Sequence, residues 1–423
     1  MSQLPTPNAQ QLVRSQDLTV LICQKMTQAG GAIPFADFMH MALYTPRLGY
    51  YSGGGQKFAD ITIGGGDFVT APEISPIFAQ SLANQAAQIL AETQGKNFNS
   101  NILELGAGTG KLAVDLLLAL QQLEQLPSQY FMLEVSDHLR QIQRETCQTK
   151  LPNDLFEKIV WLDSLPEKFS GLMLANEVLD AIPAHIVQKT AAGWCEQYVS
   201  WDEETKQFVS ILNGFAIQDS KLNGFAIQDL KLNSFAIQDS KLNSFEMPNL
   251  VKNLPADLPV GYITEVNPAT TALVKTLAQT LQQGAIFLID YGFGAREYYH
   301  PQRSDGTLMC HFQHYAHSNP FINVGLQDIT AHVDFSQIAE AGVSVGAQLA
   351  GFCSQAQFLI NCGILTILQQ YSPESVDYIK QTAAAQKLLS PAEMGDLFKV
   401  IAFSKHINTP LLGFAQSDKA HTL

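Results

Sequence analysis

The sequence predicts an α/β fold that is built on a parallel β-sheet, with added helices at both ends of the chain. Between residues 100 and 190, short apolar segments alternate with amphipathic ones, which is the pattern of strands joined by helices in a parallel sheet. The strand segments are almost continuously apolar, as expected of a sheet that is covered on both faces. A glycine-rich turn follows the first strand, and a ten-residue tandem repeat further along indicates an insertion.

The composition narrows the class of protein. The chain of 423 residues is long enough for one large domain with insertions or for two smaller domains. Acidic residues outnumber basic ones, 39 to 25, for a formal charge of -14. This balance argues against a general phosphate-binding surface and hence against a nucleic-acid partner. The acidic excess either maintains solubility or suits a cationic partner, such as a segment that bears arginine or lysine.

The cysteines and the apolar runs indicate the cellular setting. Six cysteines are scattered, and none forms a Cys-x-x-Cys pair, so neither a zinc site nor a disulfide framework is expected. No apolar run reaches the ~18 residues of a membrane span, and the polar N-terminal segment lacks the apolar core of a signal peptide. We therefore expect reduced thiols, no membrane span and a cytoplasmic location.

The first half of the chain divides into an N-terminal helical region, residues 1–95, and a core, residues 96–190. Helices are predicted over 10–30, in a segment that stops before Pro46, and from Pro76 to about Glu92. Glycine-rich loops separate them. In the core, the predicted elements in order are a strand over 101–108, a helix over 111–123, a strand over 129–136, a helix over 138–148 and strands over 158–165 and 171–183.

The pattern breaks over 191–260, which we interpret as an insertion. Residues 197–212 have the pattern of a hairpin, and a tandem repeat of period ten runs from Leu212 to about Leu250. A fixed period first suggests a repeat fold, but units this short bury little core, and their Asn-Gly and Asn-Ser steps indicate turns. We interpret the repeat as an ornamental surface insertion, and a partner-binding surface is the alternative.

The core resumes over 261–334, and residues 335–423 are predicted to be a helical region. A strand over 284–292 includes Asp290, which either caps a turn or faces the cleft. The stretch from Phe293 to Gly325 is rich in His, Tyr and Gly and is predicted to be a long functional loop. Helices are predicted over 269–284, 335–342, 354–371, 376–389 and 390–405.

The first glycine turn, with Glu104, Gly106, Gly108 and Gly110, lies between a strand and a helix. Glycines let the backbone approach a ligand closely, and the helix N-terminus presents free N–H groups. The spacing is G-x-G-x-G, whereas the dinucleotide fingerprint has its third glycine one place later. Glu104 would repel a pyrophosphate but suits a cationic ligand, such as the sulfonium and amino group of S-adenosylmethionine. A purely structural turn is the alternative.

Two further acids follow the next two strands. Glu134, at the end of the second strand, is placed to accept both ribose hydroxyls of a nucleotide. Asp163, near the end of the third strand, is a candidate for the adenine amine, although an acid there is more often a helix cap or solvated.

The fourth strand ends in Asn176 and Glu177, at the edge of the sheet where a transferred methyl group should lie. A carboxylate there can neutralise a guanidinium, align it and assist proton removal. Because the pKa of arginine is high, its deprotonation is difficult, and a carboxylate that orients the guanidinium matters more than a strong base. The alternative is a pair of turn-forming polar residues with no chemistry.

Six segments, taken in order, resemble the MidA-type family of class I S-adenosylmethionine-dependent methyltransferases. They are GGGDFVTAPEISPIFAQ, ILELGAGTGKLA, LEVSDHLRQIQ, ANEVLDAIP, LIDYGFGAREYYHPQRSDGTLMCHFQH and DITAHVDF. The resemblance covers most of residues 15–405 apart from the repeat. It implies a Rossmann-like core, S-adenosyl-L-methionine as the cofactor, and kinship with a mitochondrial complex I assembly factor that dimethylates an arginine.

The resemblance also implies roles for particular residues. Those that match the family's cofactor-binding positions are Gly66, Asp67, Thr70, Pro72, Glu73, Glu104, Gly106, Gly108 and Glu134. Asn176 and Glu177 match its motif after the fourth strand, and His332 and Asp334 resemble a signature that lines the substrate cleft. The tandem repeat belongs to no family pattern, so the protein target is left open.

We therefore predict methyl transfer to a protein arginine, linked to the assembly of a respiratory complex, with a homodimer as one possible state. One alternative is a non-catalytic assembly factor that retains the cofactor site. A weaker alternative is an NAD-dependent oxidoreductase, which the glycine spacing disfavours. Four histidines crowd one loop, His300, His311, His314 and His317. They show no fixed ligand spacing with a carboxylate, so no metal is expected.

Overall fold

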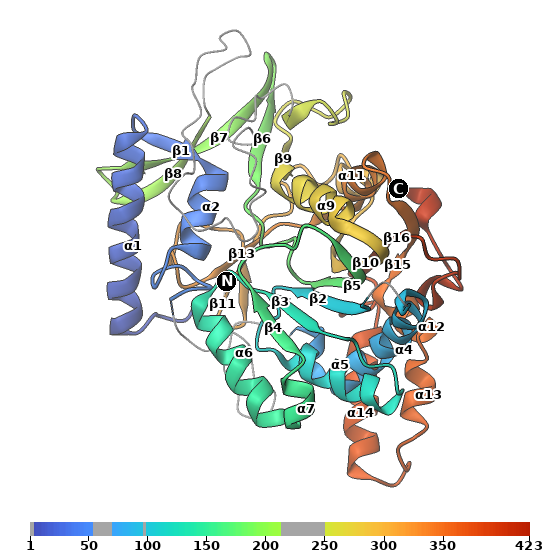
Figure 1. Cartoon of the computed structure of the whole chain (residues 1–423). Helices are drawn as coiled ribbons and strands as arrows, with labels where there is room; N and C mark the ends of the chain where they lie inside the picture. The colour runs from blue at the N-terminus through green and yellow to red at the C-terminus, as the bar shows by residue number, and fades with distance from the viewer. Residues whose placement is uncertain (1–3, 54–69, 96–98, 213–249) are drawn as a thin grey trace.

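The computed structural model describes residues 4–53, 70–95, 99–212 and 250–423 (Figure 1). Its centre is an eight-stranded sheet in the order β15-β16-β10-β5-β2-β3-β4, with the short β14 beside β10. These strands are β2 (Asn101–Leu105), β3 (Tyr130–Leu133), β4 (Ile159–Leu162), β5 (Phe169–Asn176), β10 (Leu281–Phe293), β14 (Val333–Asp334), β15 (Gln348–Ser354) and β16 (Phe398–Lys405). Only β16 runs antiparallel to its neighbours among the ordered seven.

The order of the strands locates the expected ligand site. From β2 the chain moves outward through β3 to β4, and then returns to β5 on the other side of β2. In a parallel α/β sheet, ligands bind beyond the carboxyl ends of the strands where the order reverses in this way. The site is therefore expected beyond the ends of β2 and β5.

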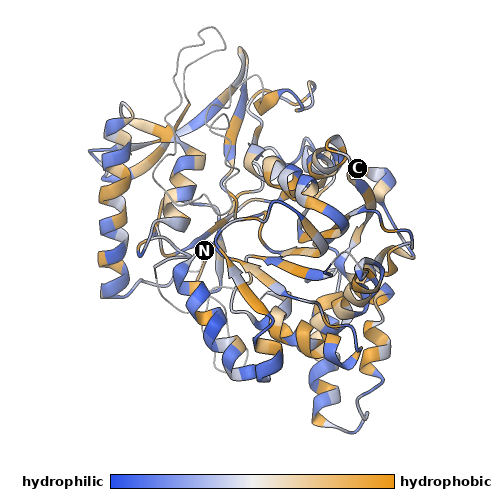
Figure 2. Ribbon diagram, viewed as in Figure 1, coloured by the Kyte–Doolittle hydropathy of each residue, from blue (hydrophilic) through white to orange (hydrophobic). Residues whose placement is uncertain are grey.

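Helices cover both faces of the sheet and enclose two apolar cores. Along β2, Ile102 faces one core and Leu103 the other, because successive side chains of a strand point to opposite faces. The first core is closed by α4 (Pro76–Thr93), α5 (Lys111–Gln122), α6 (Asp137–Lys150), α7 (Asn153–Phe156), α12 (Gln355–Asn361), α13 (Ile364–Leu368) and α14 (Val376–Leu389). The second is closed by α9 (Pro268–Thr280) and α11 (Phe335–Ser344). Figure 2 shows apolar residues concentrated along the central strands.

A second, antiparallel sheet stands beside the core with the N-terminal helices against it (Figure 1). Its order is β1-β7-β6-β9, and β8 pairs with β7. Its elements are β1 (Ala32–Pro34), β6 (His185–Thr190), β7 (Gly193–Asp202), β8 (Gln207–Leu212) and β9 (Ile263–Val266), and the helices are α1 (Ala9–Gln28) and α2 (Phe35–Tyr44). A third apolar core forms between these helices and the sheet. Because β1 pairs with β7, the N-terminal region and the inserted hairpin share one sheet.

The predicted fold class is confirmed, and most predicted elements lie where the sequence put them. The helix predicted over 10–30 is α1, which begins at a capping box between Asn8 and Gln11. The next helix, α2, ends at Tyr44, before Pro46. The hairpin predicted over 197–212 is formed by β7 and β8. The tandem repeat lies outside the described residues, apart from its ends.

The prediction of a mainly helical tail is wrong in one important part. Residues 398–405 were expected at the end of a helix, but they form β16, which pairs with β10 on one side and β15 on the other. A short apolar run is compatible with a buried strand or a buried helix, and periodicity alone does not separate the two. The same ambiguity affects the predicted helix over 269–284, since α9 ends at Thr280 and β10 begins at Leu281.

Two other regions also differ from the prediction. The stretch from Phe293 to Gly325 is not all loop. It contains α10 (Ala295–Tyr298), β11 (Met309–Phe312) and β12 (Tyr315–His317), and β13 (Asp328–Thr330) completes a three-stranded sheet with β11 and β12. Residues 261–334 were expected to continue the core, but β9, near the start of this segment, belongs to the antiparallel sheet.

Candidate active site

The glycine turn closes the end of β2. The backbone is left-handed at all three glycines, with φ of +62° at Gly106, +53° at Gly108 and +82° at Gly110, a conformation that costs glycine little. A Cβ on Gly106 would lie 2.8 Å from the Cγ2 of Val178, so the turn passes close against the segment after β5. Helix α5 then begins at Lys111, and its N-cap residue, Gly110, provides no side-chain cap. The Lys111 N–H donates to the Thr109 hydroxyl at 3.3 Å, which leaves the next N–H groups of the first turn to meet a ligand.

Glu134 lies beside this turn and is held by a network that the sequence did not reveal. Its carboxylate accepts from the Ser136 N–H (2.9 Å) and from the amide of Gln143 (3.1 Å). The same amide nitrogen donates to the carbonyl of Gly108 (3.1 Å), while the Gln143 oxygen accepts from the indole of Trp161 (3.1 Å). Gln143 is fully buried and links the acid after β3 to the glycine turn. Only its place on the buried side of a polar helix could have indicated it.

Glu104 is less accessible than the sequence suggested. Its side chain is 3% exposed, and one carboxylate oxygen accepts from the hydroxyl of Tyr130 (2.7 Å). Burial raises the pKa of Glu104 to about 7, the hydrogen bond from Tyr130 lowers it, and the nearby charge of Glu134 raises it further. Its predicted contact with a cationic ligand therefore depends on the remaining oxygen.

Asp163 follows β4, at the predicted edge of the sheet. Its side chain is 90% exposed and forms an ion pair with Arg140 at 2.7 Å. Its proposed contact with adenine stays a prediction.

The N-terminal segment ties the two halves of the site together. Thr70 precedes a short helix, α3 (Ala71–Ile74), in which Pro72 is buried. The carboxylate of Glu73 accepts a hydrogen bond from the hydroxyl of Thr109 in the glycine turn, and burial raises the pKa of Glu73. The Ala71 N–H donates to Glu177 at 3.4 Å. Gly66 and Asp67, with Phe68, lie outside the described residues.

The segment after β5 holds the predicted acceptor residues in a strained turn. Glu177 has φ of +53°, a left-handed conformation that costs a residue with a side chain of order 1–3 kcal/mol. The Asn176 amide donates to the Glu177 carboxylate at 3.1 Å, and the Glu177 N–H donates to the carbonyl of Ile289 at 2.9 Å. Burial, and next the charge of Asp180, raise the pKa of Glu177 to about 8.

Asp290 stabilises this turn from the neighbouring strand. One oxygen of its fully buried carboxylate accepts from the N–H groups of Val178 (3.2 Å), Leu179 (2.9 Å) and Asp180 (3.3 Å). Burial and the charges of Asp180 and Glu177 raise its pKa well above the ordinary value. Of the two roles that the sequence allowed, the structure therefore assigns Asp290 the cap of a turn.

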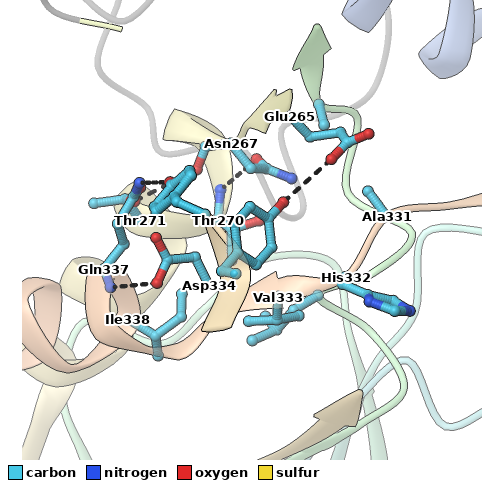
Figure 3. Close-up of a pocket in the computed structure, with 14 residues that line it drawn as sticks. Glu265, Asn267, Thr270, Thr271, Ala331, His332, Val333, Asp334, Gln337 and Ile338 are labelled. Carbon is cyan, nitrogen blue, oxygen red and sulfur yellow. Dashed lines mark hydrogen bonds between the residues drawn. The ribbon is translucent and has the colours of Figure 1, made fainter. Parts of the chain in front are cut away.

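His332 and Asp334 lie on the other side of this turn, in a pocket between α9 and α11 (Figure 3). Asp334 caps α11 by accepting from the Ser336 and Gln337 N–H groups at 3.0 and 3.3 Å, and burial raises its pKa to about 6. The His332 ring packs against Tyr291 at 5.1 Å, and burial lowers its pKa to about 4. The structure therefore joins Asn176 and Glu177 by a hydrogen bond and gives Asp334 the role of a helix cap, while the catalytic roles of His332 and Asp334 stay predictions.

The same pocket contains an acid that the sequence did not indicate. Glu265 is 3% exposed and accepts from the backbone N–H and hydroxyl of Thr307 (both at about 2.9–3.0 Å) and from the Leu308 N–H (3.0 Å). Burial raises its pKa, and these donors lower it. Glu265 thus fixes the loop that follows α10 rather than pointing to a reactant.

Three further features of the described residues concern metal ligands, cysteines and membrane-spanning helices. There, no three His, Cys, Asp or Glu side chains are grouped so that they could hold a metal ion. All six cysteines are free thiols. No helix in the same residues is long and apolar enough to cross a membrane.

Comparison with known proteins identifies the family. The model of a family of S-adenosyl-L-methionine-dependent methyltransferases matches residues 81–353, a segment that contains the glycine turn and the turn after β5. The chain belongs to this family. It is a methyltransferase enzyme that uses S-adenosyl-L-methionine, so the oxidoreductase alternative is removed.

Solved structures and curated relatives agree with this family. A structure from Burkholderia thailandensis bound to S-adenosyl-homocysteine is 44% identical, with a TM-score of 0.86 and 100% of each chain covered. A second structure from that organism is 42% identical, with a TM-score of 0.84 over the same extent. The mouse mitochondrial protein arginine methyltransferase NDUFAF7 is 27% identical over 89% of this chain and 82% of its own length. The zebrafish protein of that name is 28% identical over 91% and 85%.

The residues of this methyltransferase fit its cofactor. Three left-handed glycines leave no Cβ between the backbone and a ligand, the N-cap residue of α5 provides no side-chain cap, and a buried carboxylate follows β3. These features suit the backbone approach, the polar end and the ribose of a nucleoside-like ligand, respectively.

Proposed function

We propose that this methyltransferase transfers a methyl group to an arginine side chain of a protein, and that its target belongs to a respiratory complex. Two observations support the acceptor. Mitochondrial relatives that match most of the chain are named protein arginine methyltransferases. The turn after β5 presents Glu177 beside Asn176, beyond the carboxyl end of a central strand. The link to a respiratory complex rests on the resemblance to the MidA-type family.

Positioning of two reactants is the main task of such an enzyme. When bound, the cofactor supplies a methyl group on a positively charged sulfur, and the acceptor nitrogen bonds to that carbon while the sulfur keeps the electron pair of the broken bond. The glycine turn and Glu134 hold one reactant. Glu177 aligns the other and receives the proton that the alkylated nitrogen loses.

The observation that carries this role is the position of Glu177. Its carboxylate accepts from Ala71, whose helix is tied to the glycine turn through Glu73 and Thr109, and from Asn176 at the end of β5. Glu177 is thus linked through Ala71 to the glycine turn, where we place the cofactor, and through Asn176 to the end of β5, where we place the acceptor. A guanidinium beside it would favour the charged form of the carboxylate, which burial otherwise disfavours.

The test is methyl transfer with isotopically labelled cofactor into a lysate of the source cells, followed by mass spectrometry of the labelled residues. Wild-type protein should label arginine, and Glu177→Gln should lose at least about 100-fold of the rate while it still binds S-adenosyl-homocysteine. Glu203→Gln, at an exposed position of the hairpin, is the matched control. Label on another residue type would reject arginine as the acceptor. Partner capture without any transfer would instead favour a binding factor.

Two further proposals concern the setting of the enzyme. The named relatives are mitochondrial proteins, whereas the sequence predicts a cytoplasmic location. For this chain we propose the cytoplasm, with fractionation and immunodetection as the test. We also propose that a homodimer forms, which light scattering of the purified protein would detect.

A further inference from the structure

A second acid lies in the turn after β5 and takes no part in the contacts described for Glu177. Asp180 is 6% exposed, and its backbone is fixed on both sides. Its N–H donates to Asp290, and its carbonyl accepts from the Ala331 N–H at 3.0 Å. The Tyr291 hydroxyl acts on its carboxylate as a hydrogen-bond donor that lowers the pKa of Asp180, but one side-chain oxygen, Oδ1, is buried and has no hydrogen-bond partner among the described residues. A rigid backbone that holds an unsatisfied carboxylate oxygen indicates a missing donor.

Two tyrosines from the N-terminal region lie beside the turn that holds Asp180. The Tyr44 hydroxyl donates to the carbonyl of Ala181 at 2.9 Å, and its ring stacks on that of Tyr51 with centroids 5.5 Å apart. The Tyr51 hydroxyl donates to Asp328 on β13 at 3.0 Å. Both tyrosines are only half-buried among the described residues.

The titratable groups around this turn are acidic. Asp328 and Asp180 both raise the pKa of Tyr44 and of Tyr51, after the larger effect of burial, and Asp328 accepts the hydrogen bond from Tyr51. Asp180, Glu177 and Asp290 take part in none of the ion pairs between described side chains. Buried carboxylates without a cation are unstable as ions, so a positively charged ligand would stabilise this arrangement.

We propose that Asp180 binds the positively charged side chain of the methyl acceptor, with Tyr44 and Tyr51 as the walls of this subsite. The inference rests on the proposed arginine acceptor and deepens it. A guanidinium can donate to the free Oδ1 of Asp180 and stack its plane on a tyrosine ring. Glu177 then aligns the reacting nitrogen, and Asp180 selects for charge. A neutral side chain of the same shape would leave Asp180 unpaired.

The test compares a charged ligand with its neutral counterpart. Protein saturated with S-adenosyl-homocysteine is titrated calorimetrically with N-acetyl-arginine N-methylamide and with the citrulline derivative, which replaces the guanidinium by a urea. We expect the arginine derivative to bind at least about tenfold more tightly, as one charge-assisted hydrogen bond allows. Asp180→Asn should bind the two alike and keep its affinity for S-adenosyl-homocysteine within about twofold.

Two variants separate this role from a purely structural one. Asp180→Glu keeps the charge and should keep the preference, whereas a residue that only shapes the turn would be disturbed by both changes. Asp154→Asn, at an exposed position of α7, should behave as wild type. A preference that persists in Asp180→Asn, or wild-type protein that binds neither derivative at millimolar concentration, would overturn the proposal.

The outcomes for the subsite and for the proposed function differ. If wild-type protein methylates arginine and Asp180→Asn does so with unchanged KM, the subsite is wrong and the function stands. A third titration uses N-acetyl-lysine N-methylamide. If it binds more tightly than the arginine derivative, and Asp180→Asn loses that binding, selection for charge stands and arginine is wrong as the acceptor.

Discussion

The carboxylate of Asp290 accepts a hydrogen bond of 2.9 Å from the backbone N–H of Leu179, 111 positions earlier in the chain. One strand thus shapes the turn that follows its neighbour, and that turn presents Glu177 and Asp180 beyond the end of the sheet. Asp290 itself is fully buried and does not face the cleft. The proposed acceptor side of the site therefore depends on a buried residue of the neighbouring strand that caps this turn.

Asp290→Asn is expected to disturb this turn. Its amide keeps one acceptor oxygen, but its NH₂ group would oppose backbone donors, so the free energy of unfolding should fall by about 1–3 kcal/mol. The rate of methyl transfer should fall more than the affinity for S-adenosyl-homocysteine, because the turn lies on the acceptor side. Thermal melts, calorimetry and methyl-transfer assays measure these effects. Asp257→Asn, in an exposed loop, is the control. Unchanged stability and rate would contradict the cap role.

Gln143→Leu should weaken cofactor binding indirectly, because Gln143 positions the residues that we expect to contact the cofactor. The change removes the donor shared by Glu134 and Gly108 and the acceptor for Trp161. With about 1 kcal/mol for each of these bonds, the affinity for S-adenosyl-homocysteine should fall about tenfold or more. Gln141→Leu, at an exposed position of the same helix, should leave it unchanged. Equal affinities for the two variants would show that the network does not position Glu134.

Gly106→Ala should abolish tight binding of S-adenosyl-homocysteine. The added Cβ would meet Val178 at 2.8 Å and force a side chain into a left-handed backbone, a strain of order 1–3 kcal/mol. Gly95→Ala is a suitable control, because no atom lies within 4 Å of the added Cβ and the backbone there is not left-handed. Calorimetric titration measures both affinities. Wild-type affinity in Gly106→Ala would mean that the turn can shift without cost.

Because Glu104 is buried, we expect the stability of the ligand-free protein to depend on pH. Burial raises its pKa from 4.5 to about 7, so the folded protein holds the proton more tightly than the unfolded chain. The stabilisation is complete below pH 4.5 and is lost as the pH rises through 7. This shift corresponds to about 3 kcal/mol.

Glu104→Gln cannot ionise but can still accept from Tyr130. The free energy of unfolding of wild-type protein should therefore fall relative to this variant by about 3 kcal/mol between pH 4.5 and a pH above 7. Urea denaturation across that range measures the difference. Glu157→Gln, at an exposed position, should run parallel to wild type. If the difference in unfolding free energy between Glu104→Gln and wild type stays constant with pH, the pKa of Glu104 is not raised in the folded protein.

The errors of the sequence analysis have common physical causes. The run that forms β16 is apolar because both of its faces are covered, and that property is shared by buried helices. Asp334 ends β14 and caps α11, while the role predicted for it and for His332 in a substrate cleft stays a prediction. Short polar side chains before a helix commonly serve as caps, and a sequence motif by itself does not show that use.

The sequence by itself determined the α/β fold class, the glycine turn, the acid after β3 and the pair after β5. These features are local, because each depends on a few neighbouring residues and on the period of apolar positions. The tertiary structure decided the contacts of Gln143 and Asp290 and the placement of Asp180. Their partners come from other elements, such as Gly108 for Gln143 and Leu179 for Asp290. Only packing of the sheet brings these groups within hydrogen-bond distance.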